Sequence, residues 1–185
     1  MAIADLTIDD FQERFKRNFP FLPYYKENKS YKKGQLVYDK TADVFYNSLI
    51  DDNEQPLTDV EAWKVNEDEN SADYVSDEDI ENAWAEALEV ANEALLTDLM
   101  FLYLVAFYLS YDLNLAESGA SGIGSFPVTQ RTVGSVSESY GLPKWVLEDP
   151  ILSFYAKNGF GLKYLSMLLP KLVGNIAAVG GWTQP

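Results

Sequence analysis

The feature that most constrains the fold is an apolar segment at residues 99–109, which contains eleven residues and no charged side chain. A helix that spans a membrane needs about 20 predominantly apolar residues. The run is therefore too short to cross a bilayer and indicates a helix buried inside protein. Thr97 is placed to open this helix, which is expected from Asp98 to about Leu115 and is apolar on nearly all sides. Such a helix is typical of the centre of a bundle.

Two more regions before this segment show helical periodicity. Thr7 begins the first, and its apolar side chains repeat at helical spacing until Pro20: Ile8, Phe11, Phe15 and Phe19. The prolines of the following FPFLPYY predict an extended segment that packs its aromatic rings on the core. Ser76 begins the second helix, with Asp79 in the position of a capping box. Its apolar stripe comprises Ile80, Ala83, Trp84, Ala87, Leu88, Ala91 and Leu95, and glutamates occupy the opposite face.

The C-terminal third predicts an extended segment, two helical pieces and a tail. In FPVTQRTVGSVSESYG, small and β-branched residues alternate at strand period, which predicts an extended arm or a hairpin. Asp149 and Pro150 suit the start of a helix that runs to about Lys157. After Asn158-Gly159, residues 160–169 predict a last helix, with Leu162, Leu165 and Leu169 facing inward. Residues 170–185 begin with a proline and are rich in glycine, so we expect a flexible tail, irregular until bound.

Between residues 30 and 66 the periodicity changes to that of strands. Leu36-Val37-Tyr38, Val44-Phe45-Tyr46 and Ala62-Trp63-Lys64-Val65 are short runs separated by turn residues. They predict a three-stranded β module of roughly 35 residues, too small to be stable without packing on something else. The predicted fold class is therefore mainly α: a bundle of four to five helices over residues 1–29 and 67–185, an extended arm or hairpin, and a small three-stranded β insertion at residues 30–66.

The charge is concentrated in one part of the chain. Residues 51–93 contain sixteen acidic residues and one base, while acids and bases balance in the remainder, so this block carries the whole net charge of −15. One interpretation is a solvated linker and helix face that keeps the protein soluble. The other is a surface that repels DNA, because tight phosphate binding needs a basic footprint that is not visible here.

Two residue types are missing, and their absence limits the chemistry. The sequence contains no histidine and no cysteine. These are the commonest general base near neutral pH and the commonest zinc ligands. The acids lie on polar linkers and a solvated helix face, so glycoside hydrolysis by paired carboxylates is not expected. We expect no enzyme activity, no catalytic residues, no metal and no cofactor. The start, MAIADLTIDD, lacks the apolar core of a secretory signal, and the absence of cysteine favours a reducing cytoplasm.

Most of the chain outside residues 30–66 resembles the head-to-tail adaptor (connector) proteins of tailed bacteriophages. The similarity lies in DFQERFKRNFPFL, SDEDIENAWAEALEVANEALL, TDLMFLYLVAFYLSYDL, VTQRTVGSVSESYGLP and FGLKYLSMLL, and its most specific part is TVGSVSESY. The resemblance implies a structural virion protein of the neck, assembled in the cytoplasm of the bacterial host. It also implies a ring of about twelve copies that binds the portal and a downstream neck or tail protein. Such a ring extends the channel through which double-stranded DNA passes without sequence-specific binding, and no membrane is involved.

The resemblance also assigns candidate contacts. The arm at residues 126–140 would join neighbouring subunits of the ring, the alternative being a hairpin that closes over its own bundle. Its candidate residues are Val128, Thr132, Val133, Gly134, Ser135, Val136, Ser137 and Tyr140. The C-terminal segment would dock on the portal through Val179, Gly180, Gly181 and Trp182. The alternative for this segment is disorder without a role. In this context, the acidic block would line the DNA channel or face outward.

The insertion has a resemblance of its own. YKKGQLVY, VFY, the Asn53-x-x-Pro56 motif and Trp63-Lys64 are similar to the small chitin- or cellulose-binding modules of phage tails and glycosidases. Such modules use exposed aromatic rings as platforms for sugars, which would make Tyr38, Tyr46 and Trp63 a glycan or contact face. The alternative is that these three rings form the core of the module. The competing function is therefore a glycan-binding or surface-decoration module of a phage particle.

Overall fold

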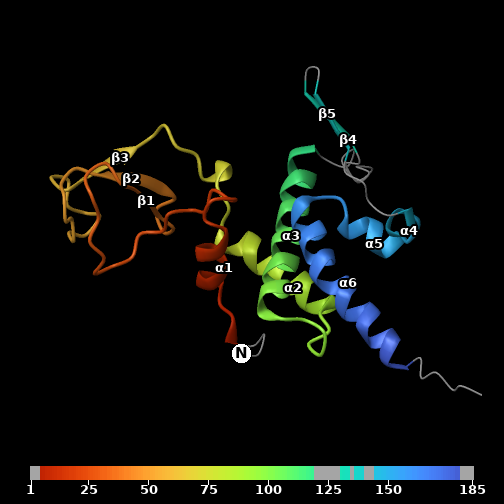
Figure 1. Cartoon of the computed structure of the whole chain (residues 1–185). Helices are drawn as coiled ribbons and strands as arrows, with labels where there is room; N and C mark the ends of the chain where they lie inside the picture. Colours follow the sequence, from red (N-terminus) through yellow and green to blue (C-terminus); the bar gives the residue numbers. More distant parts are fainter. Residues whose placement is uncertain (1–4, 119–129, 134–135, 140–143, 180–185) are drawn as a thin grey trace, which may run out of the picture. The chain divides into compact units, whose positions relative to one another are not determined.

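The computed structural model describes residues 5–118, 130–133, 136–139 and 144–179. The chain divides into two compact units, one formed by Ile8–Glu78 and the other by Asp79–Pro185 together with Met1–Thr7. The first unit is wider than the predicted insertion at residues 30–66, because the N-terminal helix and the segment after it group with the strands. Figure 1 labels the helices and strands of both units.

The unit Ile8–Glu78 is built around the three predicted strands. β1 (Leu36–Asp39), β2 (Val44–Ser48) and β3 (Trp63–Asn66) form an antiparallel sheet in that order. Val37 is opposite Tyr46, and Tyr46 is opposite Val65. Because successive side chains of a strand point to opposite faces, Val37 and Tyr38 enter two different clusters. One cluster contains Tyr31, Val37, Ala62 and Trp63, and the other contains Leu22, Tyr38 and Phe45. Side chains from outside the strands therefore pack on both faces of this small sheet.

The N-terminal helix α1 (Ile8–Phe15) is shorter than the predicted periodicity. It ends at Phe15, whose carbonyl accepts the backbone N–H of Phe19, so Phe19 follows the helix in a final turn. The rings of Phe11, Phe15, Phe19 and Phe21 pack against one another in stacked, tilted and edge-to-face pairs, with centroids 4.9–6.3 Å apart. The extended conformation predicted for FPFLPYY is confirmed, because Phe21 forms a bridge with Val75 and Tyr24 forms one with Tyr38. The 3-10 turn η2 (Ser71–Asp73) follows the sheet.

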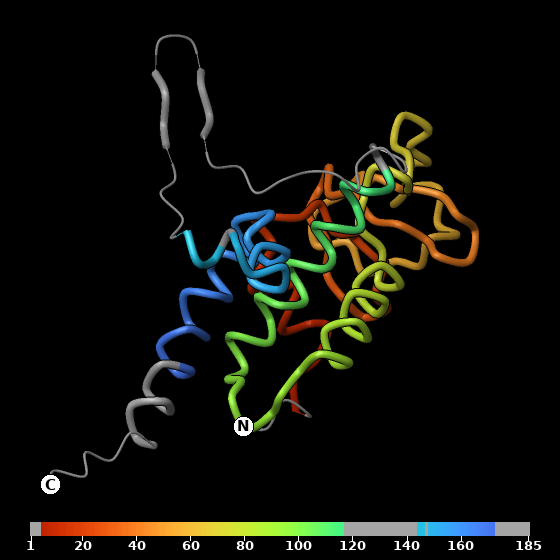
Figure 2. The backbone as a smooth tube through the Cα atoms, turned by 90° about the vertical axis from the view of Figure 1, so that its right-hand side faces the viewer, coloured from red at the N-terminus to blue at the C-terminus, as the bar shows by residue number. Residues whose placement is uncertain are grey.

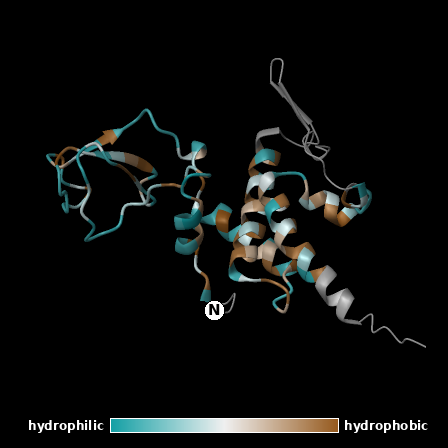
Figure 3. Cartoon of the chain, viewed as in Figure 1, coloured by the Kyte–Doolittle hydropathy of each residue, from teal (hydrophilic) through white to brown (hydrophobic). Residues whose placement is uncertain are grey.

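The second unit is helical around α3 (Asp98–Ser118), which is the predicted apolar helix. Its residues Met100–Leu109 are buried apart from Tyr103. In Figure 2, α3 (green) lies between α2 (Asp77–Val90) and α6 (Gly159–Val179). Trp84 of α2 meets Phe101 of α3 edge to face at 5.0 Å. The brown segments of Figure 3 follow α3, α5 and α6, whereas the loops of the other unit are mainly teal.

Helix α3 is longer than its apolar sequence predicted. The observed helix is longer than the apolar run, and its stretch Asp98–Ala116 is long and apolar enough to cross a membrane by length and composition alone. Half of that stretch is buried inside the protein. The burial, not the length, therefore agrees with the predicted core helix, since a core helix of this kind passes the same test.

Helix α2 is shorter than the predicted apolar stripe, and it does not bury every residue of that stripe. It ends at Val90, so Ala91 and Leu95 lie beyond it. Ile80, Ala83 and Ala87 are buried as expected, but Leu88 is 47% exposed. At 100° per residue, Leu88 projects about 100° away from Ala87. The apolar stripe is thus wider than the face that the fold buries.

Helix α5 (Pro150–Tyr155) begins where Asp149 and Pro150 predicted, but it ends before Lys157. A short helix that was not predicted, α4 (Lys144–Glu148), precedes it. The Asp149 carboxylate caps α5 by accepting the backbone N–H groups of Ile151 and Leu152 at 2.8 and 3.0 Å. The predicted interruption at Asn158 is also present, and α6 starts at Gly159.

The expectation that regular structure ends at Pro170 is wrong, because α6 continues through Pro170 to Val179. A proline inside a helix removes one hydrogen bond and crowds the carbonyl four residues earlier. The residues that follow include Ile176, Ala177 and Ala178, and alanine is the strongest helix former. Residues 170–179 of the predicted flexible tail are therefore helical, and the remainder of that tail lies outside the described residues.

Candidate functional site

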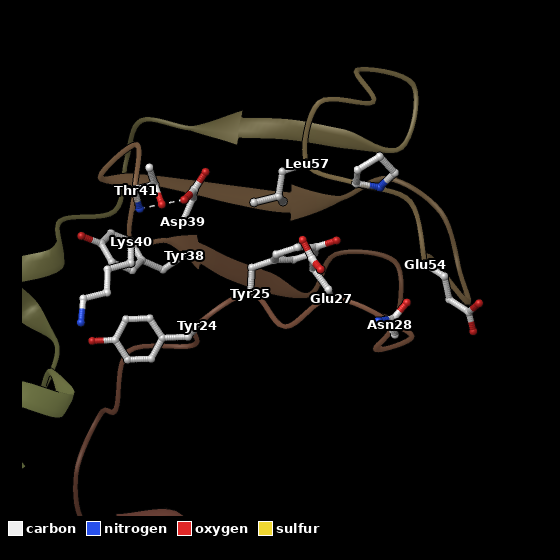
Figure 4. A pocket seen from close by; sticks show the side chains of 11 residues that line it. Tyr24, Tyr25, Glu27, Asn28, Tyr38, Asp39, Lys40, Thr41, Glu54 and Leu57 are labelled. Atoms are coloured by element: carbon white, nitrogen blue, oxygen red, sulfur yellow. Dashed lines mark hydrogen bonds between the residues drawn. The ribbon is translucent and has the colours of Figure 1, made fainter.

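A groove of about 550 Å³ lies on the unit Ile8–Glu78, beside the sheet. In Figure 4, Tyr24, Lys40 and Thr41 line one end, and Asn28 and Glu54 line the other. The groove is lined by the segment before β1, the turn between β1 and β2, and the loop after β2. Its lining residues are Tyr24, Tyr25, Glu27, Asn28, Tyr38, Asp39, Lys40, Thr41, Glu54, Pro56 and Leu57.

Backbone pairing with β1 holds the tyrosine side of the groove. The backbone N–H of Tyr25 donates to the carbonyl of Tyr38 at 3.0 Å, and the N–H of Tyr38 donates to the carbonyl of Pro23 at 2.9 Å. Pro23 has no N–H of its own but can accept a bond. The segment 23–25 therefore runs along β1 as a short parallel partner, which fixes the two tyrosines at the edge of the sheet.

The two tyrosine rings are half-buried and have different surroundings. Tyr25 stacks on Tyr31 at 5.7 Å and meets Trp63 edge to face at 5.8 Å. Burial raises the pKa of the Tyr25 hydroxyl above its ordinary value, with smaller contributions from Tyr31 and Glu27. Tyr24 meets Tyr38 edge to face at 5.9 Å, and the Lys40 ammonium lies 5.9 Å from the Tyr24 ring centroid. The rings are thus fixed by their neighbours before any ligand is present.

A buried asparagine shapes the far side of the groove. Asn53 is fully buried, and its amide Nδ2 donates to Ser48 Oγ and to the carbonyl of Ala62, both at 2.9 Å. Its Oδ1 accepts the backbone N–H of Gln55 at 3.0 Å. The Asn53-x-x-Pro56 motif is therefore a structural device that positions the loop of Glu54, Pro56 and Leu57.

The aromatic residues predicted as a glycan face are placed differently. Trp63 is 3% exposed, and its indole N–H donates to the carbonyl of Gln55 at 2.9 Å. Tyr38 is 8% exposed, and its hydroxyl donates to Asp43 Oδ1 at 2.6 Å. That hydrogen bond is the main cause of a raised Tyr38 pKa. Tyr46 is half-buried against the cluster of Tyr31 and Trp63. Tyr38 and Trp63 are core residues, as the alternative interpretation stated, and do not present ring faces as platforms.

The groove suits a polar ligand with flat faces. It combines half-buried tyrosines with carboxylates, one lysine and one amide, which supply both donors and acceptors. The sequence prediction missed Tyr24 and Tyr25 because they lie in the extended FPFLPYY segment. The signal that could have found them is the paired Tyr-Tyr directly after Pro23. Within the described residues, no three His, Cys, Asp or Glu side chains are grouped so that they could hold a metal ion.

A second groove, of about 540 Å³, lies between α2 and α3 of the helical unit. Its apolar lining comes from Ala85, Leu109, Leu113 and Ala116, and its polar lining from Asp79, Asn82, Glu86, Glu89 and Asp112. Burial raises the pKa of Glu86, and the nearby Asp112 and Glu89 raise it further. Burial also raises the pKa of Asp112. The α2–α3 groove therefore places carboxylates where their charged forms are disfavoured.

The predicted arm contains a β-hairpin. β4 (Gln130–Val133) pairs antiparallel with β5 (Val136–Ser139), with Thr132 opposite Ser137 and Val133 opposite Val136. Four of the arm candidates lie in these strands, and the other four, Val128, Gly134, Ser135 and Tyr140, lie outside the described residues. Of the portal-docking candidates, Val179 is the last residue of α6. Gly180, Gly181 and Trp182 lie outside the described residues.

Comparison of this chain with protein-family models, with characterised proteins and with solved structures finds no match.

Proposed function

We propose that this chain is a structural subunit of the neck of a tailed phage. Copies of it would form a ring that joins the portal of the head to the neck or tail and extends the DNA channel. The observation that carries the proposal is the β4–β5 hairpin, which occupies the TVGSVSESY stretch between the apolar helix α3 and the C-terminal helices. This is the stretch on which the resemblance to head-to-tail adaptors is most specific.

A ring subunit must keep its shape, and the helical unit has the packing that this requires. Phe107 of α3 contacts the rings of Phe154 and Tyr155 at 5.1 and 5.2 Å. Tyr155 also contacts Tyr164 of α6 at 5.3 Å. Burial raises the pKa of the Tyr164 hydroxyl to about 12. Aromatic contacts thus join α3, α5 and α6 into one core, which supports a rigid structural role.

The hairpin supports contact between subunits through its backbone. A two-stranded hairpin is at best marginally stable alone, and within the described residues neither β4 nor β5 pairs with a third strand. A strand from another chain can pair with an edge of such a hairpin. In the ring that we propose, Thr132, Val133, Val136 and Ser137 would contribute to this pairing between neighbouring copies.

The end of the chain would bind the portal. Gly180 and Gly181 follow directly after α6, and Trp182 is a large aromatic residue of the kind enriched among interface hot spots. Shortening the chain by residues 180–185 leaves α6 intact, so loss of portal binding in that variant would locate the contact in this segment. The variant Trp182→Ala tests the aromatic anchor alone.

Electron microscopy of the chain mixed with the portal protein encoded beside it tests the proposal. We expect rings stacked on the portal, and free chains beside bare portals would overturn the neck function. The charge of −15 and the absence of a basic footprint lead us to expect no DNA binding by the isolated chain at physiological salt.

A second candidate function is glycan binding by the groove of the unit Ile8–Glu78, since Tyr24 and Tyr25 are held half-buried beside carboxylate and amide groups. Titration of the full chain with soluble chitin and cellulose oligosaccharides would test it. Tyr24→Ala should abolish binding, whereas the matched control Tyr46→Ala, a half-buried tyrosine outside the groove, should retain it. Equal loss in both variants, or no binding by the native chain, would exclude this candidate.

A further inference from the structure

Among the described residues that line the α2–α3 groove are Glu86, Glu89 and Asp112, and none of the lining residues is a lysine or arginine. Between Lys64 and Arg131 the sequence contains neither lysine nor arginine, so α2 and α3 carry carboxylates alone. In the part of the chain that the structure describes, no salt bridge involves Glu86, Glu89 or Asp112. The α2–α3 groove therefore suits a cationic group that also carries apolar surface, since its floor is formed by alanine and leucine side chains.

A surface of this kind lies on the same unit, at α4 and α5. The Trp145 side chain is 52% exposed, and Ile151 is 68% exposed. Lys144 precedes Trp145 and pairs with Glu148 at 3.2 Å, but both side chains of this pair are largely exposed. An exposed pair of this kind contributes little to stability, so Lys144 can exchange it for another carboxylate. Residues 144–179 hold four lysines and two acids, which makes this region the basic counterpart of α2 and α3.

The two surfaces lie on different sides of α3. Phe107, Tyr108 and Tyr111 contact Phe154 of α5. The α2–α3 groove is lined on its α3 side by Leu109, Asp112, Leu113 and Ala116. At 100° per residue, the centres of these two sets are separated by about 140° around the helix axis. Figure 2 likewise shows α2 on one side of α3 and α6 on the other. Contact between the two surfaces therefore joins different copies of the chain.

We propose that Lys144 and Trp145 of one copy occupy the α2–α3 groove of the next copy. The Trp145 ring packs on Ala85, Leu113 and Ala116, which are the accessible apolar residues of the groove. The Lys144 ammonium binds the carboxylates of Glu86, Glu89 and Asp112. Because the two surfaces differ, the contact is head to tail, and repeated contacts of this kind close a ring when the rotation permits. The inference rests on the proposed neck function and adds a side-chain contact between neighbouring copies to the backbone pairing proposed for the hairpin.

Cysteine cross-linking tests the contact without background, because the native sequence contains no cysteine. Ala85→Cys places a thiol in the α2–α3 groove, and Glu148→Cys places one on α4, one turn from Lys144. A mixture of the two single variants, assembled on the portal and mildly oxidised, should give a disulfide-linked pair of unlike chains. The matched control replaces Ala85→Cys with Val90→Cys, which is exposed on α2 but does not line the groove. The control should not cross-link.

Charge reversal tests the same contact by affinity. Glu86→Lys should raise the chain concentration needed for half-maximal ring assembly at least about tenfold, because it opposes Lys144 with a like charge. Adding Lys144→Glu to this variant should restore assembly. Glu81→Lys makes the same charge change on α2 outside the groove and should have no effect. Circular dichroism of each variant verifies that the helices are intact.

The outcomes separate this inference from the function on which it rests. Rings on the portal without cross-linking between Ala85→Cys and Glu148→Cys would overturn the contact and leave the neck function standing. Cross-linked chains without rings on the portal would uphold the contact and overturn the neck function. If Glu86→Lys abolishes portal binding and Lys144→Glu does not restore it, the portal occupies the groove and the inference is wrong.

Discussion

Replacing Gly161 by alanine should destabilise the helical unit, although alanine normally favours a helix. Gly161 lies in the first turn of α6, where its backbone N–H donates to Asn158 Oδ1 at 2.9 Å. A Cβ atom at this position would lie 2.6 Å from Phe107 Cδ2 and 2.9 Å from the carbonyl carbon of Tyr155, and closer still to the Tyr155 carbonyl oxygen. Two of these three atoms belong to the backbone at the end of α5, so they cannot rotate away.

The expected loss of folding stability in Gly161→Ala is the difference between two opposing effects. Alanine gains about 1 kcal/mol over glycine in a helix interior. Inserting an extra carbon into a well-packed core costs about 1–3 kcal/mol, and the contact with backbone atoms places Gly161→Ala at the upper end. The net loss is about 2 kcal/mol, which corresponds to a fall in Tm of about 4–8 °C for a chain of this size. Thermal unfolding followed by circular dichroism at 222 nm measures it, because most of the helix lies in this unit.

Gly159→Ala is the matched control. Gly159 is the first residue of the same helix, and a Cβ atom there would meet no atom within 4 Å. Its Tm should be unchanged or slightly higher. If Gly161→Ala unfolds at the same temperature as Gly159→Ala, or above the native chain, the close approach of α6 to Tyr155 and Phe107 is not a packing constraint and the reasoning fails.

Three other predictions concern single polar groups. Asn158→Ala removes the Oδ1 acceptor at the start of α6 and the bond from Nδ2 to the carbonyl of Phe107, so it should cost about 1–2 kcal/mol in urea unfolding. Asn158→Asp should recover only part of this loss, because a carboxylate restores the acceptor but not the donor to Phe107. Asp112→Asn should raise Tm at pH 7, because burial raises the Asp112 pKa: the carboxyl contributes stability below its ordinary pKa of 3.8 and loses it as pH rises through the higher folded pKa. The gain should vanish at pH 3, and an equal gain there would contradict this cause. Asn53→Ala should cost about 2–4 kcal/mol, because it leaves buried groups without partners; amide hydrogen exchange should rise in β1–β3 and stay unchanged in α3.

The strands and the core helix could be predicted because their patterns are local. The runs at Leu36, Val44 and Trp63 alternate between two faces, and each begins a strand or lies within a residue of its start. The exposure of the aromatic rings could not be predicted in the same way. Which side chains remain accessible depends on the chain before β1 and the loop after β2, which fold onto the sheet. Tyr38 and Trp63 are covered by these segments, whereas Tyr24 and Tyr25 become the accessible rings.

The C-terminal helix shows the limit of a local rule. Pro170 is a reliable helix breaker in an isolated segment, at about 3 kcal/mol. In the folded chain, the side chains of Tyr164 and Leu165, in the turns before the proline, are buried. Directly after the proline, the Lys171 ammonium donates to the carbonyl of Leu95 at 2.8 Å. Contacts outside the helix thus support its backbone across the proline, and no pattern within residues 160–179 contains that information.

The acidic residues of the block at residues 51–93 differ in whether they line the α2–α3 groove. Glu81 does not line the α2–α3 groove, whereas Glu86 and Asp112 do, and partial burial there raises the pKa of both carboxyls. Keeping these carboxylates charged in the α2–α3 groove costs stability at neutral pH, and a cation bound there would offset that cost. If Lys144 of the next copy is that cation, assembly of rings on the portal should weaken as salt rises from 0.05 to about 0.5 M, because the Debye length shrinks. It should also weaken as the pH falls toward 5, because carboxyls with raised pKa values take up protons first. Assembly that is insensitive to both conditions would mean that apolar contact alone holds the ring, and that the carboxylates of the groove serve another purpose.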